Sequence, residues 1–423
     1  MKIFPILVCK GREIKKEELQ KRIKELRENI LPEVEILKEK IANNENDILN
    51  LEKYISETDV ILLYKPKLGL GNLVVKIVQF NLPVILFNEI GSPWTALDAL
   101  EYVYSSKNVY VAIDYEDINL QVKLLGIKKK INNTRFLVLN ADSPQWERWI
   151  CRVLGGIKKI KEKFGIEIIP IKGDEIIEIW NSVDKNRIKK LANNWMRNAE
   201  RIIEPTKGDI EKVARLYVVF KELLNKRNAQ GLTLAYAENV WKGPLPVPCV
   251  AYMSLRDEGV PCACEGDIIS LITMTILHYL VNKPSFMGNI SVDVKNSILK
   301  ISHCVAPSKM AGYDKKAHQY ILRNQHWGPP PGVLSAFVKM NTNQEVTICR
   351  LDGKLENMII TTGRIMKCQD LKGHCRHTVS IKVKDARNFI RNTSGNHHVM
   401  IYGNYIKELK KLNRVLDIIT IEI

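Results

Sequence analysis

Short apolar runs alternate with amphipathic segments over the first 134 residues of the chain. The apolar runs include IFPILV, VILLYK, PVILFN and VYVAID, and the segments between them have the 3.6-residue period of helices, as over residues 15–29. Alternation of strands and helices is typical of a parallel sheet with helices on both faces. The pattern therefore predicts a first α/β domain over residues 1–134.

The same alternation returns over residues 135–285. It begins with RFLVLNAD and IEIIPIKG, continues through a helical region over about 183–228, and ends with the strongly apolar run IISLITMTILHYLV. We expect a second doubly wound parallel sheet here, with ligands bound outside the carboxyl ends of its strands. The sequence has no G-x-G-x-x-G motif after a first strand, so it does not predict a dinucleotide site.

From residue 286 the pattern changes to apolar runs broken by turns. These runs are ILKISHCVAP, VLSAFVKM, EVTICRLDG, NMIITTGRIM and HTVSIKVK. Such spacing is typical of antiparallel β structure. The sequence thus predicts an α/β protein with two doubly wound parallel-sheet domains, 1–134 and 135–285, followed by a β-rich, barrel-like domain over 286–423.

Length and composition indicate a folded protein of ordinary domains. The chain has 423 residues, of which 45% are hydrophobic and 26% charged, so it exceeds one hydrophobic core and does not have a disordered composition. Its start has neither a secretory nor a transit pattern, and no apolar run reaches the roughly 18 residues that a membrane span needs. We therefore expect a cytoplasmic protein with no membrane partner and with free thiols at its nine cysteines.

The formal net charge of +17 raises the question of nucleic-acid binding. Most of the excess comes from lysines interspersed with glutamates on helical faces, as in IKKEELQKRIKELREN, rather than from one dense basic stripe. That distribution is typical of a solvated surface, and a balance rich in Lys, Glu and Ile also fits a thermophile. A nucleic-acid-binding module rests on charge alone, so we expect no nucleic-acid partner.

Two stretches contain candidate chemical groups. PCACEGDIISLIT places Glu265 and Asp267 at the head of an apolar run, and SGNHHVMIYGN places His397 and His398 side by side before an apolar strand. Asp267 by itself is explained as a helix N-cap. An acid, an amide oxygen and an imidazole brought together would form a metal site, whereas the alternative is a helix start and structural histidines.

The same stretches resemble a known family. The segment PCVAYMSLRDEGVPCACEGDIISLITMTILHYLVNKPSFMGN resembles the signature region of the L-fucose isomerase and L-arabinose isomerase superfamily. The segment SGNHHVMIYGNYIKELKKLNRVLDI resembles its closing part, and ILKISHCVAP and GHCRHTV are similar to stretches of its fucose-isomerase-like branch. The resemblance is specific over about residues 246–423 and extends to the preceding part in topology.

The resemblance implies a metal-dependent aldose–ketose sugar isomerase that works through an enediol. In fucose isomerases a Glu that opens the apolar helix, an Asp and a C-terminal His bind Mn²⁺, and these positions fall on Glu265, Asn289 and His397. Asn289 is a departure, because an amide keeps an oxygen ligand but cannot serve as an acid or base. Glu265 would be ligand and base, and the third ligand is left open between Asn289, His303 and water.

The resemblance also implies substrate contacts and partners. Asn396 and His398 flank the histidine ligand and are expected to contact the sugar. Second-rank pocket candidates are Arg376, His303 and His326, and Trp327 is a candidate for stacking on a face of the sugar. We expect a homo-oligomer, a trimer or hexamer, with active sites completed by a neighbouring subunit. The alternative is a carbohydrate-binding or other carbohydrate-active relative without isomerase activity, which the amide at position 289 favours.

Overall fold

The computed structural model describes most of the chain and divides it into two compact units. The described residues are 1–8, 16–64, 71–87, 101, 106, 108–142, 152–235, 245–324, 334–371 and 375–423. The first unit is Met1–Lys129 and the second is Lys130–Ile423. Among the described residues, no helix has both the length and the apolar character that crossing a bilayer requires. The second unit includes both the predicted second and third domains, so a domain boundary at residue 285 stays a prediction.

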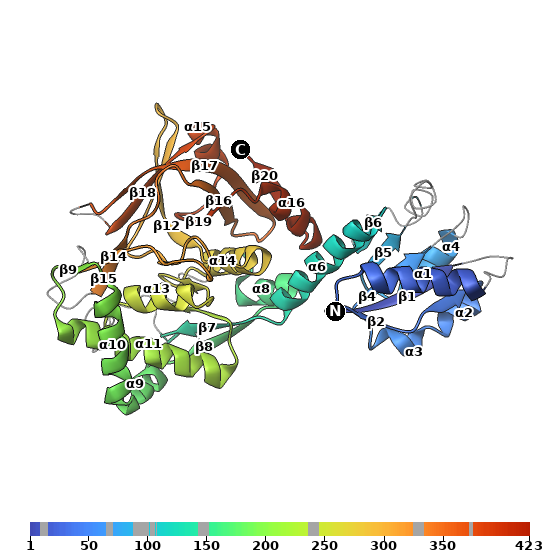
Figure 1. The fold of residues 1–423 in the computed structure, drawn as a ribbon, viewed down its shortest axis with the longest axis horizontal. Helices are drawn as coiled ribbons and strands as arrows, with labels where there is room; N and C mark the ends of the chain where they lie inside the picture. Colours follow the sequence, from blue (N-terminus) through green and yellow to red (C-terminus); the bar gives the residue numbers. More distant parts are fainter. Residues whose placement is uncertain are drawn as a thin grey trace. The chain divides into compact units, whose positions relative to one another are not determined.

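The first unit is built on a parallel sheet (Figure 1). Its strands run in the order β2-β1-β4-β5-β6, and β3 also pairs with β1. The strands are β1 (Lys2–Val8), β2 (Glu35–Ile36), β3 (Lys40–Ala42), β4 (Val60–Tyr64), β5 (Val84–Phe87) and β6 (Val109–Ala112). The helices are α1 (Lys16–Asn29), α2 (Glu45–Leu49), α3 (Glu52–Ile55) and α4 (Gly71–Val78), together with α6 (Tyr115–Asn132), whose last three residues belong to the second unit. Strands β1 and β4 are buried along nearly their whole length, which shows that both faces of the sheet are covered.

The second unit begins with another parallel sheet, in the order β11-β10-β7-β8. The strands are β7 (Arg135–Leu139), β8 (Glu167–Ile171), β10 (Gly231–Leu234) and β11 (Cys262–Ala263). The accompanying helices are α8 (Gly156–Phe164), α9 (Gly173–Ser182), α10 (Lys185–Asn198), α11 (Lys207–Arg227), α13 (Cys249–Asp257) and α14 (Ile268–Val281). These two sheets confirm the α/β class and the parallel strands predicted from the sequence pattern.

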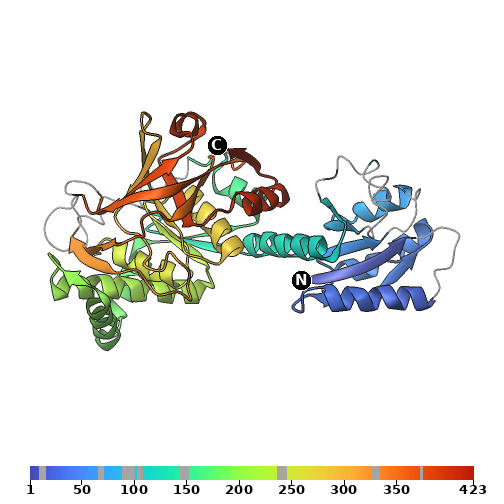
Figure 2. The same ribbon diagram turned by 45° about the horizontal axis from the view of Figure 1, so that its top comes forward.

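The second unit ends in a closed antiparallel barrel, whose strands are orange to red in Figure 2. Six strands follow one another in the order β16-β19-β12-β13-β18-β17, and β17 pairs back with β16. They are β12 (Phe286–Asp293), β13 (Ile298–His303), β16 (Glu345–Leu351), β17 (Asn357–Gln369), β18 (His377–Val383) and β19 (His397–Tyr402). Strand β20 (Ile419–Glu422) joins β17 in parallel, and the helices are α15 (Ala386–Asn392) and α16 (Ile406–Val415). The predicted barrel-like part is therefore confirmed.

A separate three-stranded sheet accompanies the barrel. Strand β14 (Tyr320–Asn324) pairs antiparallel with β15 (Leu334–Val338) and parallel with β9 (Arg201–Ile202). The run VLSAFVKM, which the sequence pattern grouped with the barrel-like strands, belongs to this smaller sheet. The difference arises because alternating apolar residues identify a strand but not its partners.

Helix α14 connects the parallel sheet to the barrel. It contacts β10 and β11 of the sheet as well as β16 and β19 of the barrel. Every residue from Ile268 to Leu277 is buried, so the helix is enclosed on all sides. This enclosure explains why IISLITMTILHYLV is apolar all round rather than amphipathic.

Arg256 of α13 forms a second connection. Arg256 is 2% exposed, and its guanidinium donates to the carbonyl of Cys262 through Nε (2.9 Å) and Nη2 (2.6 Å), and to the carbonyl of Val305 through Nη1 (3.2 Å). Cys262 belongs to the parallel sheet, and Val305 follows barrel strand β13. Among the described residues no carboxylate pairs with Arg256, so carbonyl dipoles and the nearby Tyr252 ring stabilise its charge.

We expect Arg256→Met to lower the stability of the second unit by about 3 kcal/mol, because buried carbonyls lose their donors. Thermal unfolding followed by circular dichroism measures the effect. Arg187→Met is the control, since Arg187 pairs with Glu222 at the surface, where an ion pair contributes at most about 1 kcal/mol. Equal unfolding temperatures for the two variants would show that Arg256 is not a structural connection.

Candidate metal centre

Glu265 lies in the turn between β11 and α14, at the carboxyl end of a parallel strand. This is the edge at which ligands bind in sheets of this class. Its backbone has a φ of +60°, in the left-handed region that L-residues other than Asn and Gly seldom adopt. The next residue, Gly266, also has a positive φ of +66°. A non-glycine residue held in this conformation is typical of functional turns, and it fixes the direction of the Glu265 side chain.

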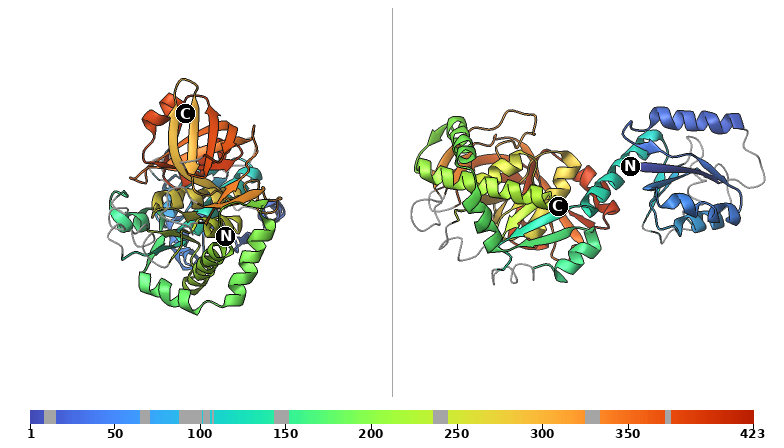
Figure 3. Two further views of the ribbon diagram at one scale, coloured as in Figure 1. Left: turned by 90° about the vertical axis from the view of Figure 1, so that its left-hand side faces the viewer. Right: turned by 90° about the horizontal axis from the view of Figure 1, so that it is seen from below.

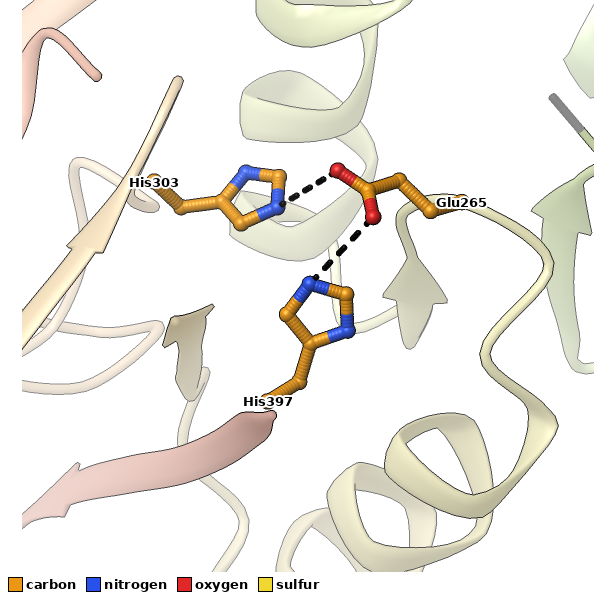
Figure 4. Close-up of side chains that lie close together, drawn as sticks. All are labelled: Glu265, His303 and His397. Atoms are coloured by element: carbon orange, nitrogen blue, oxygen red, sulfur yellow. Dashed lines mark ion pairs between the residues drawn. The ribbon is translucent and has the colours of Figure 1, made fainter. Parts of the chain in front are cut away.

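Glu265 faces two imidazoles that come from the barrel (Figure 4). His303 ends strand β13 and His397 begins strand β19. The Oε1 atom of Glu265 is 3.7 Å from Nε2 of His303, and its Oε2 atom is 3.5 Å from Nε2 of His397. These separations exceed ordinary hydrogen bonds, but two ligand atoms bound tetrahedrally to one ion at about 2.1 Å lie roughly 3.4 Å apart. The three side chains therefore have the spacing of metal ligands.

Burial separates the two imidazoles from water. The side chains of His303 and His397 are 3% and 1% exposed, whereas that of Glu265 is 28% exposed. Neither Nε2 atom has a hydrogen-bond partner among the described residues. A buried polar nitrogen without a partner is costly, and a divalent cation would satisfy both nitrogens. The group could therefore hold a metal ion, and it is open on the Glu265 side.

Asp267 orients His397. Its Oδ2 atom accepts a hydrogen bond from His397 Nδ1 at 2.9 Å, which leaves the lone pair of Nε2 directed at Glu265. Asp267 also caps α14 by accepting from the backbone N–H and the hydroxyl of Ser270, both at 2.9 Å. Burial raises the pKa of Asp267, but the bond from His397 and the charge of Arg350 outweigh burial and hold the pKa well below its ordinary value. Asp267 is thus the expected helix cap and, in addition, an anionic partner of the site.

Arg350 of β16 supports the same carboxylate. Its Nη1 atom lies 3.4 Å from Asp267 Oδ2 and donates to the carbonyl oxygen of His397. Gly395 packs directly against this guanidinium with a φ of +77°, and a Cβ at that position would overlap Arg350. The SGN turn before His397 therefore requires a glycine, both for its backbone conformation and for the space that Arg350 occupies.

The other imidazole, His303, interacts with two neighbouring thiols. Burial lowers the pKa of His303, but the neighbouring thiols of Cys264 and Cys304 and the carboxylate of Glu265 outweigh burial and raise it. Burial likewise raises the pKa of Glu265, but the interactions with His303 and His397 hold it below its ordinary value, so Glu265 is an anion. The seven described cysteines are all free, as the sequence indicated.

Asn289 and Asn396 lie beside the group. Asn289 is paired with His397 across strands β12 and β19, and its Oδ1 accepts a hydrogen bond from Asn396 Nδ2. The amide oxygen of Asn289 is therefore occupied within the protein, and its role as a metal ligand stays a prediction. Asn396 is exposed at the edge of the site. The contact between Asn396 and a substrate also stays a prediction.

Of the remaining candidates, the described residues His398 and Arg376 have partners other than Glu265. His398 follows His397 on the strand, contacts the Phe389 ring and forms a hydrogen bond with Thr393. Burial lowers the pKa of His398 to about 3, so its imidazole is neutral and packs inside the protein. Arg376 pairs with Asp370 and Glu204. His326 and Trp327 lie outside the described residues.

His303 has a more definite place in the structure than the sequence indicated. The sequence left it open as a third ligand beside Asn289 and water and also as a second-rank sugar contact, and the structure places it in the candidate ligand group. The roles of Asp267 toward His397 and of Arg350 were not foreseen. The available signal was the SHC triplet at the end of an apolar run, together with a second acid two positions after Glu265.

No family model matches the chain, and no curated protein matches it either. The resemblance to fucose isomerases therefore stays an expectation drawn from the sequence.

We expect Glu265→Gly to be more stable than Glu265→Ala by about 1 kcal/mol in the absence of metal, because only glycine adopts a φ of +60° without steric cost. Chemical unfolding of the two variants measures the difference. The matched control pair is Glu258→Gly and Glu258→Ala. Because φ at position 258 is −96°, which alanine adopts without cost, the alanine variant should be the more stable of the two. The same order at both positions would contradict a backbone constraint at Glu265.

Proposed function

We propose that Glu265, His303 and His397 bind a divalent cation and that the protein is a metal-dependent aldose–ketose isomerase with the doubly wound, fucose-isomerase-like architecture expected from the sequence. One observation carries the proposal. Two buried imidazoles present Nε2 atoms, unpaired among the described residues, to the two oxygens of one carboxylate. A single cation would satisfy all of these atoms.

The ligand set favours a metal of intermediate hardness. Two imidazoles and one carboxylate suit Mn²⁺, Fe²⁺, Co²⁺ and Zn²⁺, whereas Mg²⁺ and Ca²⁺ prefer oxygen ligands. Mn²⁺, which the resemblance implies, is compatible with this set. In our proposal His303 takes the place that the family gives to an acid, so the site has one negative charge from its ligands rather than two.

The reaction moves one proton between neighbouring carbons of a sugar. Glu265 takes the proton from C2 of the aldose to give an enediol and returns it to C1, while the hydroxyl proton on O2 passes to O1. A bound cation would polarise the two substrate oxygens and so acidify the C2 hydrogen. Glu265 is suited to this role because it is anionic and is the one member of the group whose side chain is partly exposed.

Amide groups at the edge of the site would position the substrate. Asn289 and Asn396 lie next to His397 and offer a donor and an acceptor to sugar hydroxyls. By the same resemblance we propose a cytoplasmic homo-oligomer, a trimer or hexamer, whose partner is a small sugar rather than nucleic acid or membrane.

A carbohydrate-binding relative without isomerase activity is the second candidate. Asn289 favours it, because an amide stands where the resemblance expects an acid and its oxygen is bonded to Asn396. A site with one carboxylate can bind hydroxyl groups but has fewer groups for proton transfer.

Metal affinity is expected to depend on Asp267 as well as on the ligands. Calorimetric titration of the metal-free protein with Mn²⁺ or Co²⁺ should give one site per chain, and His303→Gln should remove it. Asp267→Asn should weaken the affinity about 10- to 100-fold, because His397 loses the anion that fixes its tautomer.

Asp385→Asn is the matched control for Asp267→Asn. Asp385 caps α15 by accepting from the backbone N–H of Asn388, as Asp267 caps α14, but no described histidine is bonded to it. The metal affinity of the Asp385→Asn variant should equal that of the wild-type protein. Equal losses in both variants would attribute the effect to helix capping rather than to orientation of His397.

Isomerase activity should appear as exchange of the C2 hydrogen of an aldose with solvent deuterium. Proton NMR of a panel of aldoses that includes L-fucose and L-arabinose, with Mn²⁺ in D₂O, measures it. Glu265→Gln should slow exchange by at least about 100-fold, because the amide cannot accept the proton. Thermal stabilisation by a sugar without exchange would instead support the carbohydrate-binding candidate.

A further inference from the structure

A basic hollow lies between helices α9, α10 and α11, apart from the candidate metal centre. These helices are green in Figure 3 and occupy the side of the second unit that faces away from the barrel. The hollow has a volume of about 590 Å³, within the range of small-molecule sites. It is lined by Trp180, Lys185, Ile188, Lys189, Gly208, Glu211, Lys212 and Arg215.

Positive charge dominates the lining. Four of the side chains are cationic, and the single carboxylate, Glu211, already pairs with Lys207 at 3.9 Å. Within the part of the chain that the structure describes, Lys185, Lys189 and Lys212 have no carboxylate within ion-pair distance. Lys185 and Lys189 are four positions apart on one helix, where like charges repel. The hollow therefore concentrates cations without counter-ions of its own.

The fourth cation is held in place by an aromatic ring. The guanidinium of Arg215 lies 5.0 Å from the centre of the Trp180 ring, which restricts its orientation through a cation–π contact. Trp180 is 7% exposed and forms, with the buried Ile188, the apolar floor of the hollow. Arg215 is thus ordered before a ligand arrives, which lowers the entropic cost of binding.

The backbone at the start of α11 adds a further donor. Thr206 caps the helix by accepting from the N–H of Asp209, which leaves the N–H of Gly208 without a hydrogen-bond partner among the described residues. Gly208 lines the hollow, and a Cβ there would approach only Thr206 Oγ1, at 3.7 Å. An anion could therefore approach this backbone closely, at the positive end of a 21-residue helix.

We infer that this hollow binds a small molecule with two or more closely spaced phosphate groups. Several converging cations, one of them a guanidinium, and a free helix N–H are the donors that phosphate oxygens require. Two features of the lining do not suit single-stranded nucleic acid. The charges gather in one concave site rather than along a stripe. The one aromatic ring of the lining, Trp180, is covered by Arg215, so it offers no free face on which bases could stack. The inference is independent of the proposed isomerase activity.

The test is titration of the full chain with sodium tripolyphosphate at about 0.15 M salt, where weak surface attraction is screened. One site per chain is expected. The Lys189→Glu/Lys212→Glu variant should bind at least about tenfold more weakly, because two charge-assisted contacts are replaced by repulsion. Lys189 and Lys212 are both exposed, and an unchanged unfolding temperature of the variant will confirm that its fold is intact.

The control variant is Lys161→Glu/Lys190→Glu, which makes the same change in net charge at exposed lysines outside the hollow. It should bind tripolyphosphate as the wild-type chain does. No binding by the wild-type chain, or equal losses in the two variants, would overturn the inference.

Two further arms identify the source of the phosphates. A nucleoside triphosphate that binds more tightly than tripolyphosphate, with the same dependence on Lys189 and Lys212, supports an organic polyphosphate. Equal affinities support recognition of the phosphate chain alone. If single-stranded nucleic acid binds through these lysines while tripolyphosphate does not, the inference of a small-molecule site is wrong.

Discussion

The buried carboxylate of Asp267 is the interaction on which the candidate site depends. It starts helix α14, accepts a hydrogen bond from His397 at the start of β19, and neutralises Arg350 of β16. These three elements belong to the parallel-sheet half and the barrel half of one unit, so this anion adds a third connection to those made by the packing of α14 and by Arg256. Removing one partner of such a buried group leaves an uncompensated charge, which typically costs 3–5 kcal/mol. The geometry of the candidate ligand group and the stability of the core are therefore coupled in this part of the molecule.

The two acids in CEGD have different tasks because their backbones differ. Glu265 is held in a left-handed conformation and projects toward two imidazoles, whereas Asp267 is wholly enclosed and acts through His397. The barrel contributes the imidazoles at the ends of its strands, and the parallel sheet contributes the carboxylate at the carboxyl end of β11. A site composed in this way places charged and polar groups where two apolar layers meet, which is a common location for ligand sites.

The periodicity of the sequence was sufficient for the class of fold and for part of the site. Strand–helix alternation predicted the parallel sheets, and closely spaced apolar runs predicted the barrel. The Asp267 cap followed from local sequence, because capping involves residues three positions apart. By contrast, the partners of VLSAFVKM and the position of His303 depend on which strands pair, and strand pairing over long distances has no local signature. The surroundings of His398 also could not be read from its neighbour: adjacent residues on a strand face opposite sides, so His398 lies against Phe389, and its contact with a sugar stays a prediction.

The candidate ligands come from a turn and from two strands that are remote in the sequence, and this distribution has a thermodynamic consequence. A chain in which the barrel has not closed onto α14 holds no complete ligand set, so a cation would associate with the native state alone. By mass action, free metal at about a thousand times its dissociation constant would add roughly 4 kcal/mol to the free energy of unfolding. The resistance of the second unit to heat and to proteolysis would then report the supply of the ion, as well as the sequence of the protein.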